Sequence, residues 1–292
     1  MRHRIIQYLS MTKPRIGIMV LVVTAMGFFL GCGSFYPLDV FALTLVGTLL
    51  SCAGAATLNH YLERDLDSLM VRTRNRPLVT HEISPSSALA FGTSLVLVGV
   101  LLLAFFVNLL TAFLALLTAF LYVVVYTPLK RLTWINTVIG AIPGALPPLG
   151  GWAASTGGLD LGAWILFCVL FLWQHPHFFS IAWLYRDDYN SAGYKMLPAI
   201  DAAGDRTIAL TMATAALLIP ISILPFFLGM AGPLYLCGAL TFGILFFGAS
   251  LFFSVNMNVR SAKTLLKVSL IYLPGILGLV ILDGTYWRLF SL

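Results

Sequence analysis

Phe41–Leu58 reads FALTLVGTLLSCAGAATL, and Asn59–Pro77 continues it as NHYLERDLDSLMVRTRNRP. The first segment is almost wholly apolar, whereas the second holds three carboxylates and four arginines within nineteen residues. Asn59, Glu63 and Asp67 recur every four residues, so on a helix they lie on one face, about one turn apart. Such a row at a membrane border is costly unless something needs it. We predict that it holds a divalent metal and, through the metal, a diphosphate.

The composition of the whole chain is that of an integral membrane protein. Of 292 residues, 60% are hydrophobic and only 10% are charged, with a mean hydropathy of +0.95, whereas soluble domains are about 25% charged. The net charge of +6 does not indicate nucleic-acid binding, because the basic residues are spread over short segments between apolar runs. No hydrophilic segment is long enough for a separate soluble domain, so we expect residues 1–292 to form a single integral-membrane domain.

Nine apolar spans predict an all-α polytopic fold with nine transmembrane helices, since most spans approach the roughly 20 residues that cross about 30 Å of hydrocarbon. The spans are 16–32, 39–58, 87–107, 109–126, 138–154, 161–181, 207–229, 233–253 and 268–286. The fifth is short and rich in glycine and proline, which predicts a kinked or broken helix there. Near the start of the seventh span, Asp201 and Asp205 are both candidates to cap the helix that begins close to Thr207, and Asp205 is the favoured one.

The distribution of charge predicts the orientation. Sixteen of the seventeen basic residues lie at the N-terminus or in the loops that share its side of the membrane. The positive-inside rule then places the N-terminus in the cytoplasm and the C-terminus outside. Eight of the eleven acidic residues lie on that same side, in the loops after the second and sixth spans. Two long polar loops that mix acids and bases on one side indicate an active site facing the cytoplasm.

The carboxylates of the first acidic loop fit a magnesium site. Mg²⁺ prefers oxygen ligands and is usually held by one or two carboxylates together with substrate phosphates. Glu63 and Asp67 are the expected ligands, with Asn59 or Asp65 assisting. Three arginines follow, and guanidinium groups suit phosphate oxygens. These arginines are Arg72, Arg74 and Arg76. The alternative interpretation of the whole cluster is an ordinary helix end with solvated salt bridges.

Two further polar loops carry candidate residues. Lys130 and Arg131 either bind an anionic headgroup or only anchor the chain at the membrane surface. Asp187 and Asp188, followed by Lys195, form either a second metal or phosphate site or a solvated loop with local salt bridges.

The end of the sixth span carries Trp173-Gln174-His175-Pro176-His177. Polar and titratable residues inside an apolar run usually face the protein interior or a cavity. The two histidines can bind a metal or haem iron, orient a substrate, or serve helix packing.

The chain resembles the UbiA-type intramembrane prenyltransferases, which have nine transmembrane helices and two acid-rich loops on one side. Within them it is similar to the protohaem IX farnesyltransferases, or haem O synthases. The first acidic stretch carries the wider resemblance, although Glu63 stands where the wider pattern has an aspartate. The narrower resemblance rests on four runs: Met70-x-Arg72-Thr73-x-x-Arg76-Pro77, Lys130-Arg131-x-Thr133-x-x-Asn136, Gly140-Ala-x-x-Gly144-Ala-x-Pro147-Pro148-x-Gly150-Gly151-Trp152, and Trp173-Gln174-x-Pro176-His177-Phe178.

The resemblance implies Mg²⁺-dependent transfer of a farnesyl group from farnesyl diphosphate to a vinyl group of haem b, with addition of water, to give haem O. Haem b is then a substrate rather than a cofactor. The implied metal ligands are Glu63, Asp67 and Asp65, and the implied catalytic residues are Asn59, Glu63, Asp67, Arg72 and Arg76. The diphosphate would be bound by Arg72, Arg76, Lys130, Arg131 and Lys195, and the haem by His177 and Gln174.

Two alternatives stay open on the sequence alone. One is a UbiA-type enzyme with an aromatic or lipid acceptor, and the other is a transporter, since broken helices and charges also mark transport sites. The expected setting is the bacterial cytoplasmic membrane, with the mitochondrial inner membrane as the other option. Haem A synthase or a terminal oxidase is compatible as an assembly partner, although no residue marks such a contact.

Overall fold

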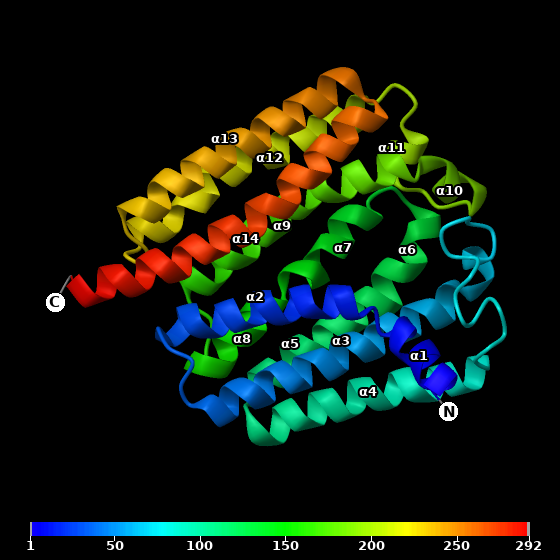
Figure 1. Cartoon of the computed structure of the whole chain (residues 1–292), viewed down its shortest axis with the longest axis horizontal. Coiled ribbons are helices and arrows are strands. Elements are labelled where there is room, and N and C mark those ends of the chain that lie inside the picture. Colours follow the sequence, from blue (N-terminus) through cyan, green and yellow to red (C-terminus); the bar gives the residue numbers. More distant parts are fainter. Residues whose placement is uncertain (1, 291–292) are drawn as a thin grey trace. The chain divides into compact units, whose positions relative to one another are not determined.

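The computed structural model describes the backbone of residues 2–290 and the side chains of residues 3–283. It is helical, with no strand in that range (Figure 1), which confirms the predicted all-α membrane fold. The chain divides into an N-terminal unit, Met1–Gly158 with Asp187–Lys195, and a C-terminal unit, Leu159–Arg186 with Met196–Leu292.

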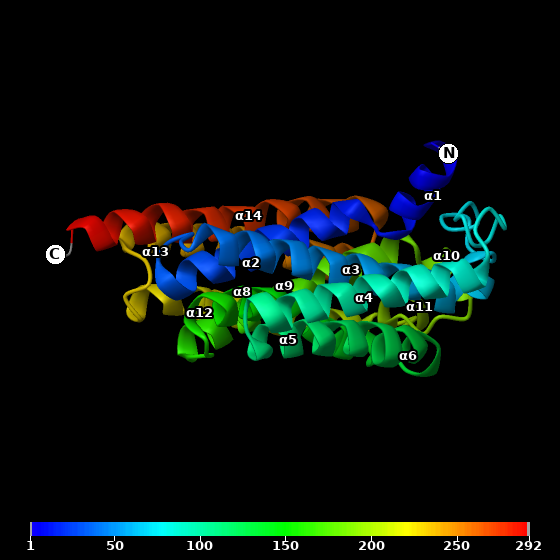
Figure 2. The same ribbon diagram turned by 90° about the horizontal axis from the view of Figure 1, so that it is seen from below.

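The described residues of the N-terminal unit form ten helical elements. They are α1 (Arg2–Met11), α2 (Pro14–Cys32), α3 (Leu38–Asp67), α4 (Pro85–Phe106), α5 (Leu109–Phe120), the π-helix η1 (Leu121–Tyr126), α6 (Thr127–Leu132), α7 (Asn136–Ala145), α8 (Pro147–Thr156) and most of α10 (Arg186–Ser191). Helices α3 and α4 run side by side, as both views show (Figures 1 and 2).

The C-terminal unit contains five helices. They are α9 (Leu161–Leu184), α11 (Leu197–Ile200), α12 (Asp205–Phe227), α13 (Pro233–Asn256) and α14 (Val259–Phe290). Helix α9 packs against α12 and α14, and α13 packs against the same two helices.

Eight stretches within the described residues are helical, long enough and apolar enough to cross a membrane. Eight of the nine predicted spans are therefore single long helices. The expected fifth span is not a single helix but the pair α7 and α8, each of ten residues. The break falls at Leu146, directly before Pro147 and Pro148, because proline has no N–H to donate and clashes with the preceding turn. The predicted break in this span is confirmed.

Polar residues fix where several helices begin. Ser84, Asn108 and Asp160 each accept a hydrogen bond from a backbone N–H in the first turn of α4, α5 and α9, which satisfies donors that have no partner within the helix. At α12 the preference for Asp205 as the cap is wrong. The carboxylate of Asp201, rather than that of Asp205, accepts the backbone N–H of Thr207 at 2.8 Å, because Asp205 already lies inside the first helical turn.

Close backbone contact between α2 and α8 depends on glycine. A Cβ at Gly151 would lie 1.9 Å from the carbonyl oxygen of Thr24, and one at Gly27 would lie 2.0 Å from that of Pro148. Small residues let membrane helices approach closely enough for dense van der Waals packing. The glycine-rich run therefore holds the broken span against the first long helix of the N-terminal unit.

Candidate active site

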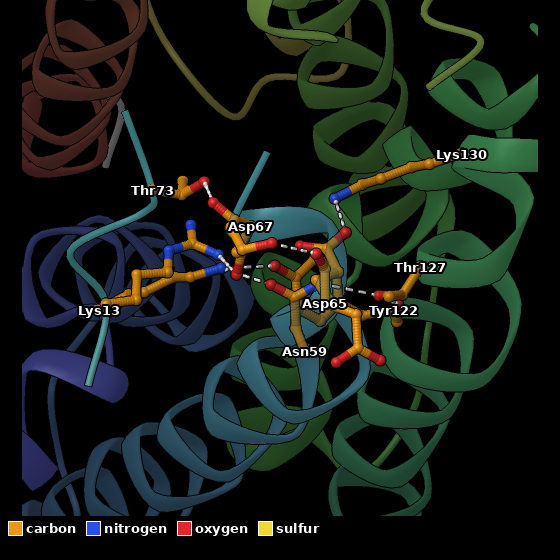
Figure 3. A network of polar contacts seen from close by, with 11 residues as sticks. Lys13, Asn59, Asp65, Asp67, Thr73, Tyr122, Thr127 and Lys130 are labelled. Atoms are coloured by element: carbon orange, nitrogen blue, oxygen red, sulfur yellow. Dashed lines mark hydrogen bonds and ion pairs between the residues drawn. The ribbon is translucent and has the colours of Figure 1, made fainter. Parts of the chain in front are cut away.

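The C-terminal turns of α3 present three polar side chains on one buried face. Helix α3 extends nine residues beyond the predicted apolar span and ends at Asp67. Asn59, Glu63 and Asp67 are respectively 0%, 5% and 1% exposed. The spacing of four residues thus produces the shared face that the sequence predicts (Figure 3).

Glu63 is paired with Lys130, which comes from α6. The Nζ of Lys130 lies 2.7 Å from Oε1 of Glu63, and both side chains are largely buried. The same ammonium lies 4.7 Å from the ring centroid of Tyr126 and 5.7 Å from that of Tyr194. Aromatic faces stabilise a cation, so the two tyrosine rings add to the stabilisation of the Lys130 ammonium by Glu63.

Asp67 is paired with Arg76 from the loop that follows α3. The Nη1 of Arg76 donates to Oδ2 of Asp67, and the hydroxyl of Thr73 donates to the Asp67 backbone carbonyl at 2.9 Å. These contacts fold the arginine-bearing loop back over the end of its own helix. The second carboxylate oxygen, Oδ1, is buried and has no hydrogen-bond partner in the structure.

Asn59 is held from both sides. Its Oδ1 accepts a hydrogen bond from Nζ of Lys13 at 2.7 Å, and its Nδ2 donates to the hydroxyl of Thr127 at 3.0 Å. Lys13 also donates to the hydroxyl of Tyr122 at 3.2 Å. Burial lowers the pKa of Lys13 to about 7, and the nearby Arg76 adds to the effect. Lys13 and Lys130 reach this region from opposite sides in Figure 3.

Lys13, Tyr122 and Thr127 are site residues that the sequence did not identify. Lys13 immediately precedes the first apolar span, where a basic residue is also expected from the positive-inside rule alone. Its distance along the chain from Asn59, 46 residues, hides the contact. The only sequence signal was a cation directly beside Pro14, at the start of an apolar helix.

Several residues of the predicted set do not join this cluster. The side chain of Asp65 is 82% exposed and lies 3.6 Å from Arg64. Arg131 and Lys195 are also exposed. Lys195 contributes through its backbone instead, since its N–H donates to the carbonyl of Lys130 at 2.6 Å.

The second acidic loop meets the first through Asp188. Its two carboxylate oxygens accept the backbone N–H groups of Val71 and Arg72, each at 3.2 Å. The guanidinium of Arg72 lies 5.9 Å from the ring centroid of Tyr189. Asp187 is exposed. The geometry therefore gives Asp188 a structural task, that of fixing the backbone beside the arginine-rich stretch.

The predicted haem-binding residues lie on α9 of the C-terminal unit. Gln174 is 4% exposed and donates from Nε2 to the carbonyl of Leu170 at 3.0 Å. His177 contacts the hydroxyl of Ser269 through Nδ1 at 2.7 Å, and its ring stacks on Trp173. Both side chains thus have definite orientations on the helix.

The donor set of the N-terminal unit suits Mg²⁺ rather than a metal held by protein alone. Among the described residues, no three His, Cys, Asp or Glu side chains gather as a metal-binding group. Two buried carboxylates, one with an unpartnered oxygen, stand beside an amide and three cations. Mg²⁺ is commonly bound by one or two carboxylates and completed by phosphate oxygens and water, so the residues present fit it.

Comparison with known proteins adds a family and close relatives. The model of the UbiA prenyltransferase family matches residues 20–271. A "Protoheme IX farnesyltransferase" of Solibacter usitatus is 42% identical over 285 residues, covering 94% of this chain and 98% of the relative. A protein of the same name from Salinibacter ruber is 44% identical over 276 residues, with coverage of 94% and 98%.

Solved structures share the fold at lower identity. A digeranylgeranylglyceryl phosphate synthase matches with a TM-score of 0.82 and 20% identity, covering 97% of this chain and 99% of the other. A UbiA homologue from Archaeoglobus fulgidus bound to DMAPP and Mg²⁺ matches with a TM-score of 0.73 and 20% identity, at the same coverage.

Proposed function

The chain belongs to the UbiA prenyltransferase family, and from this premise we propose that it transfers the farnesyl group of farnesyl diphosphate to a vinyl group of haem b. The chain is a prenyltransferase. The observation that supports the haem acceptor is identity of 42% and 44%, over nearly the whole length, to two relatives named protoheme IX farnesyltransferase. We further propose that water is added at the alkylated vinyl group, so that the product is haem O.

The acidic face of α3 would hold the metal. Glu63 and Asp67 are the proposed ligands, with the amide of Asn59 beside them. Asp65 is left out because its carboxylate is exposed and paired with Arg64. Bound there, Mg²⁺ would neutralise charge on the diphosphate as it leaves.

The cations of the cluster would bind the rest of the diphosphate. Arg76 and Lys130 are each paired with a carboxylate that the metal would take over, so both become available to phosphate oxygens at the same step. Lys13 lies beside them on Asn59. Preorganised cations in a buried site stabilise the charge that develops on a leaving group. Arg72 is a further proposed contact, and Arg131 and Lys195 would act at the exposed rim.

Burial of the cluster serves the chemistry of the allylic group. When the C–O bond of an allylic diphosphate breaks, the carbon fragment becomes cationic and water captures it readily. Asn59, Glu63 and Asp67 are almost completely buried, so little bulk water reaches the diphosphate end of the site. Exclusion of water prevents premature hydrolysis.

We also propose the cellular setting. Eight apolar helices among the described residues fit a multi-pass membrane protein. With the broken pair α7 and α8 as a ninth crossing, the charge pattern supports the bacterial cytoplasmic membrane, a cytoplasmic N-terminus and an outward C-terminus. Residues 1–292 would work as one catalytic domain, and haem A synthase or a terminal oxidase would receive the product.

Mass analysis of the haem product tests the function. Purified protein in lipid nanodiscs is incubated with haem b, farnesyl diphosphate and Mg²⁺. We expect a haem heavier by one farnesyl group and one hydroxyl group, since the water that is added gives up a proton. Detection of a prenylated aromatic compound or lipid, with haem b unchanged, would show that haem b is not the acceptor. Flux of substrate across vesicle membranes without any covalent product would indicate a transporter.

A further inference from the structure

Ser269 on α14 organises two aromatic residues of α9. Its backbone carbonyl accepts the indole N–H of Trp173 at 2.9 Å. Its hydroxyl lies 2.7 Å from Nδ1 of His177 and also 2.7 Å from the carbonyl oxygen of Leu266. Ser269 is fully buried, so bulk water does not compete for these contacts.

The position of one hydrogen decides the protonation of His177. A serine hydroxyl carries a single hydrogen, and a carbonyl oxygen only accepts. The contact with Leu266 therefore takes the hydrogen of Ser269, and in the contact with His177 the hydroxyl must accept from Nδ1–H. The reverse assignment would leave two oxygens 2.7 Å apart with no hydrogen between them.

This assignment leaves Nε2 of His177 with a lone pair. Neutral imidazole has one N–H, and here it lies on Nδ1. No described residue makes a hydrogen bond to Nε2 of His177. The ring is stacked on Trp173, with centroids 4.8 Å apart and planes inclined by 20°. Hydrogen bond and stacking together fix both the tautomer and the plane of the imidazole.

We propose that Ser269 is a positioning residue that fixes His177 as the Nδ1–H tautomer, so that Nε2 binds the iron of the haem substrate. A histidine that binds metal through one nitrogen commonly donates its other N–H to an oxygen, which sets the tautomer and the ring orientation. The nature of the ligand rests on the proposed function, whereas the tautomer rests on geometry alone.

His175 supplies an internal comparison. Its Nδ1 lies 2.7 Å from the carbonyl oxygen of Phe171, which only accepts, so Nδ1 of His175 is protonated as well. The hydrogen bond of this histidine is to the backbone of its own helix rather than to Ser269. A change at Ser269 should therefore alter the signals of His177 and leave those of His175 in place.

The tautomer can be measured without any substrate. The chain has five histidines, so histidine labelled with ¹³C and ¹⁵N gives few signals, and His177→Gln assigns the one of interest. We expect Nε2 of His177 to be unprotonated in the unaltered protein and the tautomer to change in Ser269→Ala. Ser250→Ala is the matched control, since Ser250 is fully buried and donates only to Phe246 of its own helix.

Titration with ferric haem b tests the second half of the proposal. The Soret band and the electron paramagnetic resonance spectrum report whether a histidine is an axial ligand of the haem iron. We expect Ser269→Ala to weaken haem binding about 10-fold or more, as removal of such supporting partners does at metal sites. Ser250→Ala should bind as the unaltered protein does, and His177→Ala should lose the histidine signature.

The outcomes separate this proposal from the proposed function. An Nε2–H tautomer in a protein that makes haem O would overturn the role of Ser269 and leave the function intact. Absence of haem binding in the unaltered protein would overturn both the iron contact and the haem acceptor. Equal haem affinity in Ser269→Ala and Ser250→Ala would also overturn the role of Ser269.

Discussion

Replacing Asp67 by asparagine should reduce prenyl transfer by roughly 100-fold or more, while the same change at Asp65 should have little effect. The two carboxylates lie two residues apart on one helix, yet Asp67 is 1% exposed and the side chain of Asp65 is 82% exposed. Asparagine keeps the shape of the side chain and removes only its charge. The pair of variants therefore isolates the effect of a buried charge at the proposed metal site.

The magnitude follows from Coulomb's law. Opposite unit charges about 4 Å apart attract by about 4 kcal/mol at an effective dielectric constant of about 20. Loss of the Asp67 charge is partly offset, because Arg76 is released from its ion pair and is free to bind the diphosphate. A net loss of about 3 kcal/mol corresponds to roughly 100-fold. The Asp65–Arg64 contact, in contrast, is an exposed ion pair, and such pairs contribute about 0–1 kcal/mol to stability.

The assay is the rate of haem O formation in nanodiscs, followed by chromatography and mass spectrometry over a range of Mg²⁺ concentrations. Rates are normalised to the amount of folded variant in the membrane, because Asp67→Asn leaves Arg76 without its ion pair. Activity of Asp67→Asn within about threefold of the unaltered protein would refute the metal-site reasoning. An Asp65→Asn variant as impaired as Asp67→Asn would refute the distinction between the buried and exposed faces of α3.

Three further predictions address the metal, the ion pair and the packing. Chelation of divalent metal should abolish turnover and added Mg²⁺ should restore it; undiminished turnover in chelator would contradict a metal-dependent reaction. Glu63→Gln and Lys130→Met should each destabilise the protein by about 3–5 kcal/mol, because each leaves one buried charge unpaired. In thermal unfolding, the double variant should lose less stability than the two single variants do together. Strict additivity of the two losses would show that the pair is uncoupled. Gly151→Ala should lower the unfolding temperature, since its Cβ would lie 1.9 Å from a backbone oxygen, whereas Gly150→Ala should not, because nothing lies within 4 Å; equal effects would contradict the packing of α2 on α8.

Much of the fold follows from the sequence because the membrane imposes a simple rule. Long apolar runs become helices when no water is present to satisfy the backbone, and the adjacent prolines Pro147 and Pro148 mark the break within the fifth predicted span, since proline has no N–H to donate. The same regularity predicted the shared face of Asn59, Glu63 and Asp67. Helical geometry also places Asp65 away from that face, since a step of two residues turns a helix by about 200°.

The rest of the site depends on contacts between distant parts of the chain. Lys13 and Lys130 look alike in sequence, as basic residues at the ends of apolar spans. Only the fold shows that one binds Asn59 and the other Glu63. Asp188 likewise fits a metal ligand in sequence, and its use as an acceptor for two backbone amides emerges only when the two loops meet.

The ion pairs at the end of α3 affect how the protein folds and how long it persists in the cell. Glu63 and Asp67 each have a cation from their own unit, so neither of these two buried carboxylates must wait for a metal to be neutralised. The protein can complete its folding in the membrane, and escape proteases that remove unfinished chains, before haem or isoprenoid arrives. Its cellular amount should therefore follow synthesis rather than the supply of either substrate.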